Sequence, residues 1–331
     1  MKEIKIVVTM DCEPTTATSH PAATGPNDWA LGERAACGYA EIAASYGFPA
    51  TFFVHPEAAQ AQSDVFGQLR DDGACLGLHM HPWKYSLWRH QGRRFLAHYG
   101  GLSEDEQRAL LSEAAALWHD ALGTWPLYFR PGTFSANDAI YKVLAELKFR
   151  GGSCSIPGRM MPEMRAIWSG AEPDPHRAND CFRQAPGALD FVNMPVSVDF
   201  SRMLQGRIGR RLHPDLRPDI DWEAQYGVTY STIAANLVDQ VLARAPAVPV
   251  INLITHNHYD YRDPADPAHG RLKESLDALC AACHDANVRP VGATLEQVVD
   301  DVLAVPCKAE DFVCEGGILE TAGSVSTLRQ G

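Results

Sequence analysis

Four short clusters of polar side chains each follow an apolar, β-branched run that is typical of a strand. The clusters are Asp11-Cys12-Glu13, His79-Met80-His81-Pro82-Trp83, Arg130-Pro131-Gly132 and Thr255-His256-Asn257-His258. Residues i and i+2 of a strand point to the same face, so each D-x-E or H-x-H pair can aim both side chains one way. Two carboxylates and up to four imidazoles brought together would offer N and O ligands to a divalent metal, as in a metal-dependent hydrolase.

Each of these residues also has an ordinary structural interpretation. Asp11 and Glu13 could cap a turn or a helix, and Trp83 could be a core residue instead of a platform for a sugar ring. The pair His79 and His81, beside Pro-Trp at a strand end, is predicted to bind metal. Lone histidines are interpreted as structural residues: His20, His55 and His269.

The clusters need a scaffold that brings them together, and alternating strands and helices supply one. The candidate strands are Ile4–Met10, Ala50–His55, Ala74–His81, Leu127–Pro131, Arg150–Ser155, Phe191–Val198, Val248–Asn257 and Pro290–Ala293. The candidate helices are Glu33–Tyr46, Ser103–Leu122, Asn137–Leu147, Thr229–Ala245 and Gly270–Ala286. This alternation predicts an α/β fold with a parallel sheet, open or closed into a barrel. In a parallel barrel the carboxyl ends of the strands carry the active site.

Composition excludes several classes of protein. The 331 residues carry 29 Lys and Arg against 41 Asp and Glu, so the formal net charge of −12 argues against nucleic-acid binding. No apolar run approaches the roughly 20 residues of a membrane span. The apolar run at the N-terminus is too short for a signal peptide, so we expect a cytoplasmic protein with its nine cysteines reduced. Cys280 and Cys283 fall at helical spacing and are predicted to be buried helix residues instead of a haem attachment site.

One barrel domain is predicted for residues 1–306. It would contain an insertion without regular structure near residues 157–190, long enough to cover a substrate. Residues 307–331 are weakly patterned, and we expect a partly disordered tail.

The order of the polar motifs resembles that of the polysaccharide deacetylase family, the NodB-homology group also called carbohydrate esterase family 4. The resemblance covers about residues 4–300 and rests on Thr9–Glu13, Gly77–Pro82, Phe129–Gly132 and Leu253–His256. The His81-Pro82-Trp83 turn is similar to a WalW-like branch associated with lipopolysaccharide biosynthesis. The resemblance implies a distorted (β/α) barrel of about seven parallel strands that uses a metal, usually Zn²⁺, to remove acetyl from N-acetylated sugars.

Roles for individual residues follow from the same resemblance. Asp11 matches the general base, Arg130 the arginine that orients it, and His256 the general acid that protonates the leaving amine. The metal and a backbone N–H near Gly132 would hold the oxyanion. The implied metal ligands are Glu13, His79 and His81. The implied substrate contacts are Trp83, Pro131, Gly132 and His258.

Two motifs depart from the family pattern. The family has two consecutive aspartates, whereas Cys12 follows Asp11 here, so Glu13 is the nearest second carboxylate and the roles of Asp11 and Glu13 are exchangeable. The family spaces its metal histidines four residues apart, whereas His79 and His81 are two apart. Should His79 not reach the metal, the remaining ligand would come from Cys12, His256 or His258, or the protein would be a non-catalytic relative. The aspartate that supports the acid has no clear match, and the candidates are Asp190 and Asp199.

Five arginines gather between Ser201 and Asp219 in this acidic chain: Arg202, Arg207, Arg210, Arg211 and Arg217. They could form a solvated surface. Alternatively, because guanidinium groups pair bidentately with phosphate, Arg207, Arg210 and Arg211 would bind a sugar carried on a nucleotide or lipid diphosphate.

The leading hypothesis is therefore a metal-dependent deacetylase of an N-acetylated sugar or glycan precursor. The alternatives are a metal-dependent amidohydrolase acting on a non-sugar amide and a catalytically silent sugar- or metal-binding relative.

Overall fold

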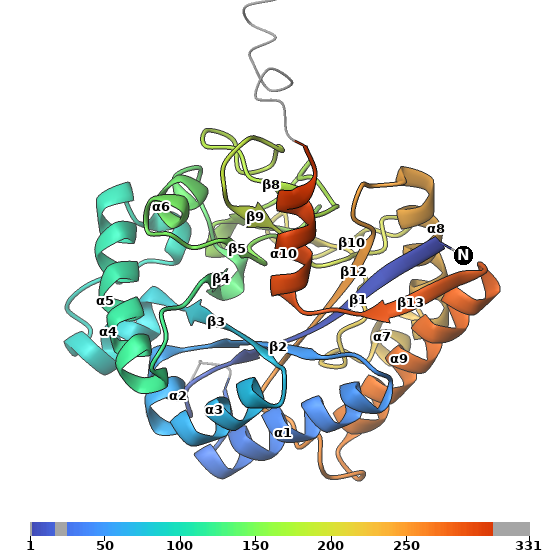
Figure 1. The fold of residues 1–331 in the computed structure, drawn as a ribbon, viewed down its shortest axis with the longest axis horizontal. Coiled ribbons are helices and arrows are strands. Elements are labelled where there is room, and N and C mark those ends of the chain that lie inside the picture. Colours follow the sequence, from blue (N-terminus) through green and yellow to red (C-terminus); the bar gives the residue numbers. More distant parts are fainter. Residues whose placement is uncertain (1, 17–24, 307–331) are drawn as a thin grey trace, which may run out of the picture.

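A sheet of mainly parallel strands, curled into an open barrel, forms the centre of the molecule (Figure 1). The computed structural model describes residues 2–16 and 25–306. The sheet order is β12-β1-β2-β3-β4-β5-β9-β8, and β13 pairs with β1 beside β2. All these strands are parallel to their neighbours except β8, which is antiparallel to β9. The strands are β1 Lys2–Cys12, β2 Ala50–Val54, β3 Cys75–Met80, β4 Tyr128–Pro131, β5 Gly151–Gly152, β8 His176–Arg177, β9 Val192–Asn193, β12 Val250–His256 and β13 Val288–Gly292. The predicted α/β fold with a parallel, barrel-like sheet is confirmed.

Backbone contacts bridge the opening between β9 and β12. The Ser197 N–H donates to the carbonyl of Asn252 at 3.0 Å, and the Asn252 N–H donates to Ser197 Oγ at 3.0 Å. Asn252 Nδ2 donates to the carbonyl of Pro195 at 3.0 Å. The chain after β9 thus completes the barrel wall without forming a regular strand.

Helices surround the sheet on its outer side (Figure 1). They are α1 Trp29–Ser45, α2 Pro56–Ala61, α3 Ser63–Asp71, α4 Pro82–His90, α5 Glu104–Leu122, α6 Ile140–Glu146, α7 Trp222–Tyr226, α8 Tyr230–Arg244 and α9 Pro267–Asp285. The sequence predicted α1, α5, α6, α8 and α9. The helix α5 begins at a capping box between Ser103 and Glu106, in which each side chain bonds the other residue's backbone N–H. The shorter helices α2, α3, α4 and α7 were not predicted, because five to nine residues give little periodic pattern.

The central strand β1 shows how the layers are divided. Its even-numbered residues, from Ile4 to Cys12, pack in the core between the sheet and the outer helices. Val7 belongs to a second hydrophobic cluster, inside the barrel, that also contains Leu295 and Val299 of α10 (Leu295–Ala304). The helix α10 therefore fills the barrel interior, and it lies across the hollow of the sheet in Figure 1. The next inward residues of β1 are Thr9 and Asp11, so this face changes from apolar to polar towards the carboxyl end.

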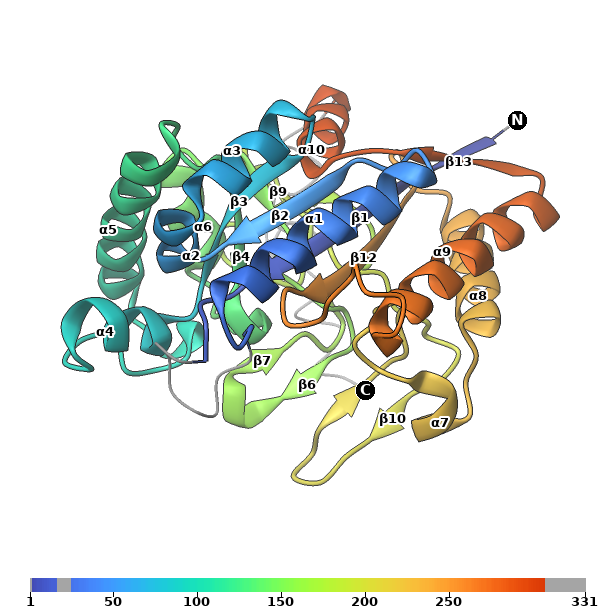
Figure 2. The ribbon, with the colours of Figure 1, turned by 90° about the horizontal axis from the view of Figure 1, so that it is seen from below.

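The segment near residues 157–190, predicted as an insertion without regular structure, contains only elements of two or three residues. It contains β6 (Met160–Met161) and β7 (Ala166–Ile167), which join β10 (Leu204–Gln205) and β11 (Arg211–Leu212) in a second sheet of order β10-β11-β6-β7. Figure 2 shows this small sheet at one side of the main sheet. Strands of two residues are too short to carry an alternating pattern, so they could not be predicted from the sequence. The predicted tail 307–331 and His20 lie outside the described residues.

Within the described residues no helix is long and apolar enough to cross a membrane. The seven cysteines in this part of the chain are all free thiols. Cys280 and Cys283 lie on the helix α9, as the sequence predicted; Cys283 is buried, whereas Cys280 is only half-buried.

Candidate active site

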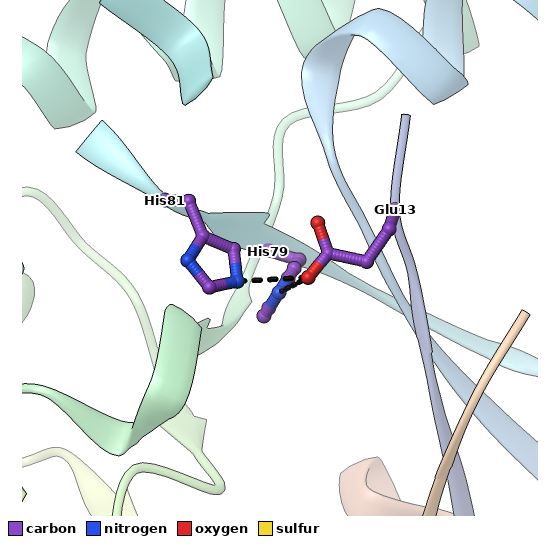
Figure 3. A group of neighbouring side chains, drawn as sticks. All are labelled: Glu13, His79 and His81. Carbon is purple, nitrogen blue, oxygen red and sulfur yellow. Dashed lines mark hydrogen bonds and ion pairs between the residues drawn. The ribbon is translucent and has the colours of Figure 1, made fainter. Parts of the chain in front are cut away.

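Glu13, His79 and His81 form a buried cluster at the carboxyl ends of β1 and β3 (Figure 3). Glu13 Oε1 lies 2.8 Å from His81 Nε2 and 3.2 Å from His79 Nε2. One potential ligand atom from each residue lies within 4.8 Å of the other two. The structure thus brings together the three residues that the resemblance implied as metal ligands, despite the two-residue spacing of the histidines.

The hydrogen bonding of His79 tests whether a metal fits this cluster. His79 Nδ1 lies 3.1 Å from the carbonyl oxygen of Arg130, which can only accept, so Nδ1 carries a hydrogen. In the neutral ring, Nε2 then presents its lone pair to Glu13 Oε1. Two acceptors that face each other require a cation between them or a second proton on the ring. Burial lowers the pKa of His81 to about 4, which leaves that imidazole neutral at neutral pH and able to act as a ligand. The donor set therefore fits a divalent metal, which Glu13, His79 and His81 would hold.

The second oxygen of Glu13 is paired with a buried lysine. Lys84 Nζ, in the first turn of α4, lies 2.8 Å from Glu13 Oε2, and both side chains are about 1% exposed. Burial alone would raise the pKa of Glu13, but His81, Lys84 and His79 outweigh burial and hold the pKa well below its ordinary value. Glu13 is therefore an anion in this site.

Backbone contacts fix the position of Glu13, which lies one residue beyond the end of β1. The Glu13 N–H donates to Asn257 Oδ1 at 2.9 Å, and Asn257 Nδ2 donates to the Glu13 carbonyl at 3.1 Å. Cys12 packs in the hydrophobic core between the sheet and the outer helices. Cys12 is therefore not among the ligands that the structure brings to this cluster.

Asp11 is oriented by Arg130, as the resemblance implied. Arg130 Nη1 donates to Asp11 Oδ1 at 2.7 Å, Nη2 donates to Thr9 Oγ1 at 2.8 Å, and Nε donates to the Ser153 carbonyl at 3.2 Å. Arg130 is fully buried, so these contacts lock its guanidinium. Asp11 Oδ2 remains directed into the site, 4.0 Å from His79 Nδ1 and 4.0 Å from His256 Nε2.

His256 ends β12 and has an aspartate behind it. Its Nδ1 lies 2.5 Å from Asp219 Oδ2, and Thr255 Oγ1 donates to Asp219 Oδ1. Burial alone would lower the pKa of His256, but Asp219 outweighs burial and raises the pKa above its ordinary value. Burial would raise the pKa of Asp219, and His256 in turn lowers it. The site therefore holds an aspartate behind a histidine that binds its proton more tightly than an ordinary histidine does.

The two aspartates suggested by the sequence as supports for His256 lie elsewhere. Asp190 is an exposed partner of Arg177. Asp199 is buried and accepts hydrogen bonds from Asn236 and Gln240 of α8. Both suggestions were wrong because spatial proximity to His256 depends on the loop before α7, whose path leaves no signal in the sequence.

The candidate substrate-binding residues surround the cluster. The Trp83 ring centroid lies 6.1 Å from that of His81, and the His258 centroid lies 5.5 Å from that of His256. Pro131 and Gly132 are buried at the end of β4. A Cβ atom on Gly132 would lie 2.3 Å from the His81 ring, so only glycine allows the chain to pass there.

The candidate anion-binding arginines lie on and beside the β10–β11 hairpin. Arg207 and Arg211 are exposed, whereas Arg210 forms an ion pair with Glu163. Arg217 is buried in a pair with Asp215. The cluster of five arginines is therefore divided, and Arg202, Arg207 and Arg211 remain as its exposed part.

Sequence reasoning missed three residues of this site: Lys84, Asp219 and Asn257. Lys84 directly follows the His-Pro-Trp turn. A helix that begins at Pro82 places Lys84 in its first turn, and Pro82 was the signal in the sequence for that helix start. Asn257 stood within a motif but had no partner there, because its partner Glu13 lies 244 residues away.

Comparisons with known proteins found a family that part of this chain resembles. A sequence model of the polysaccharide deacetylase family matches residues 37–152, a segment that includes His79, His81 and Arg130 but not Asp11 or His256. The match supports a hydrolase acting on amide bonds. No curated protein matches the chain.

Two solved structures are similar over most of their length. One, from Mycobacterium smegmatis, is assigned to the polysaccharide deacetylases; it is 17% identical, covers 92% of this chain and 91% of its own, and gives a TM-score of 0.55. The other, Puue allantoinase, is 13% identical, covers 92% of each chain and gives a TM-score of 0.52. At these identities the similarity shows the fold.

Proposed function

We propose that this protein is a metal-dependent deacetylase that hydrolyses the N-acetyl group of an amino sugar or glycan precursor. The observation that carries the proposal is the pairing of Asp11 and His256 beside the Glu13–His79–His81 cluster. Each is held from behind by its own partner, Asp11 by Arg130 and His256 by Asp219, and their reactive atoms lie 4.0 Å apart. This separation is too long for a direct hydrogen bond, so both groups are available to a reacting molecule.

A divalent metal, for which we propose Zn²⁺, would act as a Lewis acid towards the amide carbonyl when bound by Glu13, His79 and His81. Asp11 would accept the proton of the attacking water. Arg130 donates to Asp11 Oδ1 and so leaves Oδ2 for this proton. His256 would deliver a proton to the leaving amine from Nε2, while Asp219 stabilises the imidazolium through Nδ1.

The surroundings support a sugar substrate. Trp83, half-buried beside His81, offers an aromatic face to a sugar ring, and His258 lies beside His256. A role in lipopolysaccharide or surface-glycan synthesis in the cytoplasm remains a proposal that rests on the His-Pro-Trp motif. A diphosphate carrier on the substrate would contact Arg207 and Arg211, which are exposed.

The test is acetate release from N-acetylglucosamine oligomers and nucleotide-linked N-acetyl sugars, with a cyclic amide such as allantoin as the competing class. Asp11→Asn should lose at least about 100-fold in turnover and retain zinc, because the base is lost and the ligands are not. Glu13→Gln should lose zinc as well. Loss of zinc in Asp11→Asn together with its retention in Glu13→Gln would exchange the two roles. Hydrolysis of the cyclic amide without acetate release would replace the sugar substrate by a non-sugar amide.

A further inference from the structure

Lys84 is an unusual neighbour for a metal ligand. Its ammonium group lies 2.8 Å from Glu13 Oε2, and the two side chains are each about 1% exposed. Burial of a lysine is costly unless its charge is paired, so this contact is a built feature of the site. It places a fixed cation on the carboxylate that would bind the metal.

The charges in the site are already matched in pairs. Asp11 is paired with Arg130, Asp219 with His256, and Glu13 with Lys84. A divalent ion bound to Glu13 would add two positive charges beside a buried ammonium group. Because charges interact strongly where water is excluded, this repulsion opposes metal binding.

The pairing also divides the two oxygens of Glu13. Oε1 faces His79 and His81, whereas Oε2 accepts from Lys84. While Lys84 occupies Oε2, Glu13 can offer a metal only one oxygen.

We propose that Lys84 is an internal counter-cation that competes with the divalent metal for Glu13 and thereby sets the metal affinity of the site. The proposal rests on the metal site of the proposed function. It predicts that metal binds more weakly than the two histidines and one carboxylate would allow on their own, so that the metal exchanges readily with the solution.

The test is a zinc titration of the folded chain by isothermal calorimetry, with a competing chelator for tight binding. Lys84→Met should bind zinc about 10- to 100-fold more tightly than the wild type, the range by which groups around metal ligands alter affinity. Lys84→Arg, which retains the charge, should stay within about threefold of the wild type. Lys142→Met is the matched control, because Lys142 is an exposed lysine paired with Glu104, and its affinity should not change.

A double-mutant cycle tests whether the effect passes through Glu13. In the Glu13→Gln background, where zinc binding should be lost, Lys84→Met should not restore it. Circular dichroism checks folding, and Lys84→Gln replaces Lys84→Met should the latter fail to fold. Equal affinity in the wild type and in the charge-removing variants would overturn the role of Lys84 and leave the proposed function standing. Absence of zinc binding in every variant would overturn the metal site itself, and acetate release measured on the same samples would show whether the hydrolase survives without it.

Discussion

Removal of the charge behind His256 is the sharpest test of the acid. In Asp219→Asn the carboxylate 2.5 Å from His256 Nδ1 becomes neutral, while the burial that lowers the pKa of His256 persists. An opposite charge at this range shifts a pKa by about 1–3 units, equivalent to roughly 1.4–4 kcal/mol. The pKa of His256 should therefore fall below its ordinary value.

The sign of the effect on activity follows from the role of His256. The acid acts in its protonated form, so activity is lost as pH rises through the pKa of His256. Lowering that pKa should move the alkaline limb of the kcat/KM profile to lower pH by about 1–3 units. Turnover at neutral pH should fall by up to about 10- to 10³-fold, because each unit by which the pKa falls removes at most nine-tenths of the protonated acid.

The assay is acetate release from an N-acetylglucosamine oligomer across pH 5–10. Asp199→Asn is the matched control, because Asp199 is a buried carboxylate bonded to Asn236 and Gln240. Asp199→Asn should lower the melting temperature and leave the alkaline limb in place. An alkaline limb that does not move in Asp219→Asn would refute the assignment of His256 as the acid.

Three further outcomes are expected. In Gly132→Ala the new Cβ atom would lie 2.3 Å from the His81 ring, so zinc binding should weaken at least about 10-fold in a titration. Gly67→Ala is the control, because Gly67 faces open space and its substitution should not change zinc binding. Equal zinc affinities in the two variants would contradict the close packing of Gly132 against His81. Burial lowers the pKa of His176 to about 4, so the unfolded chain binds a proton at this residue more readily than the folded protein does. The free energy of unfolding should therefore fall by up to about 3 kcal/mol as the pH is lowered from 6.5 towards 4. In His176→Asn the free energy of unfolding measured in urea should not fall in this way. If it falls as much as in the wild type, other groups cause the pH dependence. Removal of the metal by a chelator should lower both the melting temperature and the activity. A ligand at 100 times its Kd stabilises the native state by about 2.7 kcal/mol, and this stabilisation is lost with the metal. Full activity after chelation would exclude a metal-dependent reaction.

The positions of the parallel strands, and of the polar residues at their carboxyl ends, could be predicted from the sequence. Buried apolar runs predicted all eight parallel strands, and the i, i+2 spacing predicted that His79 and His81 share a face. The polar pairs could be placed together because parallel strands end at one edge of the sheet. The partners within the site could not be predicted in the same way. Asp219 lies in a loop whose path depends on packing against β12, and the Lys84 contact depends on where α4 begins.

The hydrogen bonds between Glu13 and Asn257 have a consequence for how the protein is made. They join residues 244 positions apart, and β12 must lie beside β1 before they can form. At 5–20 residues per second, a ribosome needs roughly ten to fifty seconds to reach Asn257 after it has passed Glu13. Throughout that interval the nascent chain contains Glu13 and, later, both histidines. It still lacks Asn257, which holds the Glu13 backbone in place, and His256, the proposed acid. Premature release before β12 would therefore yield a fragment without hydrolytic activity, and metal loading becomes a late event that follows synthesis of almost the whole domain.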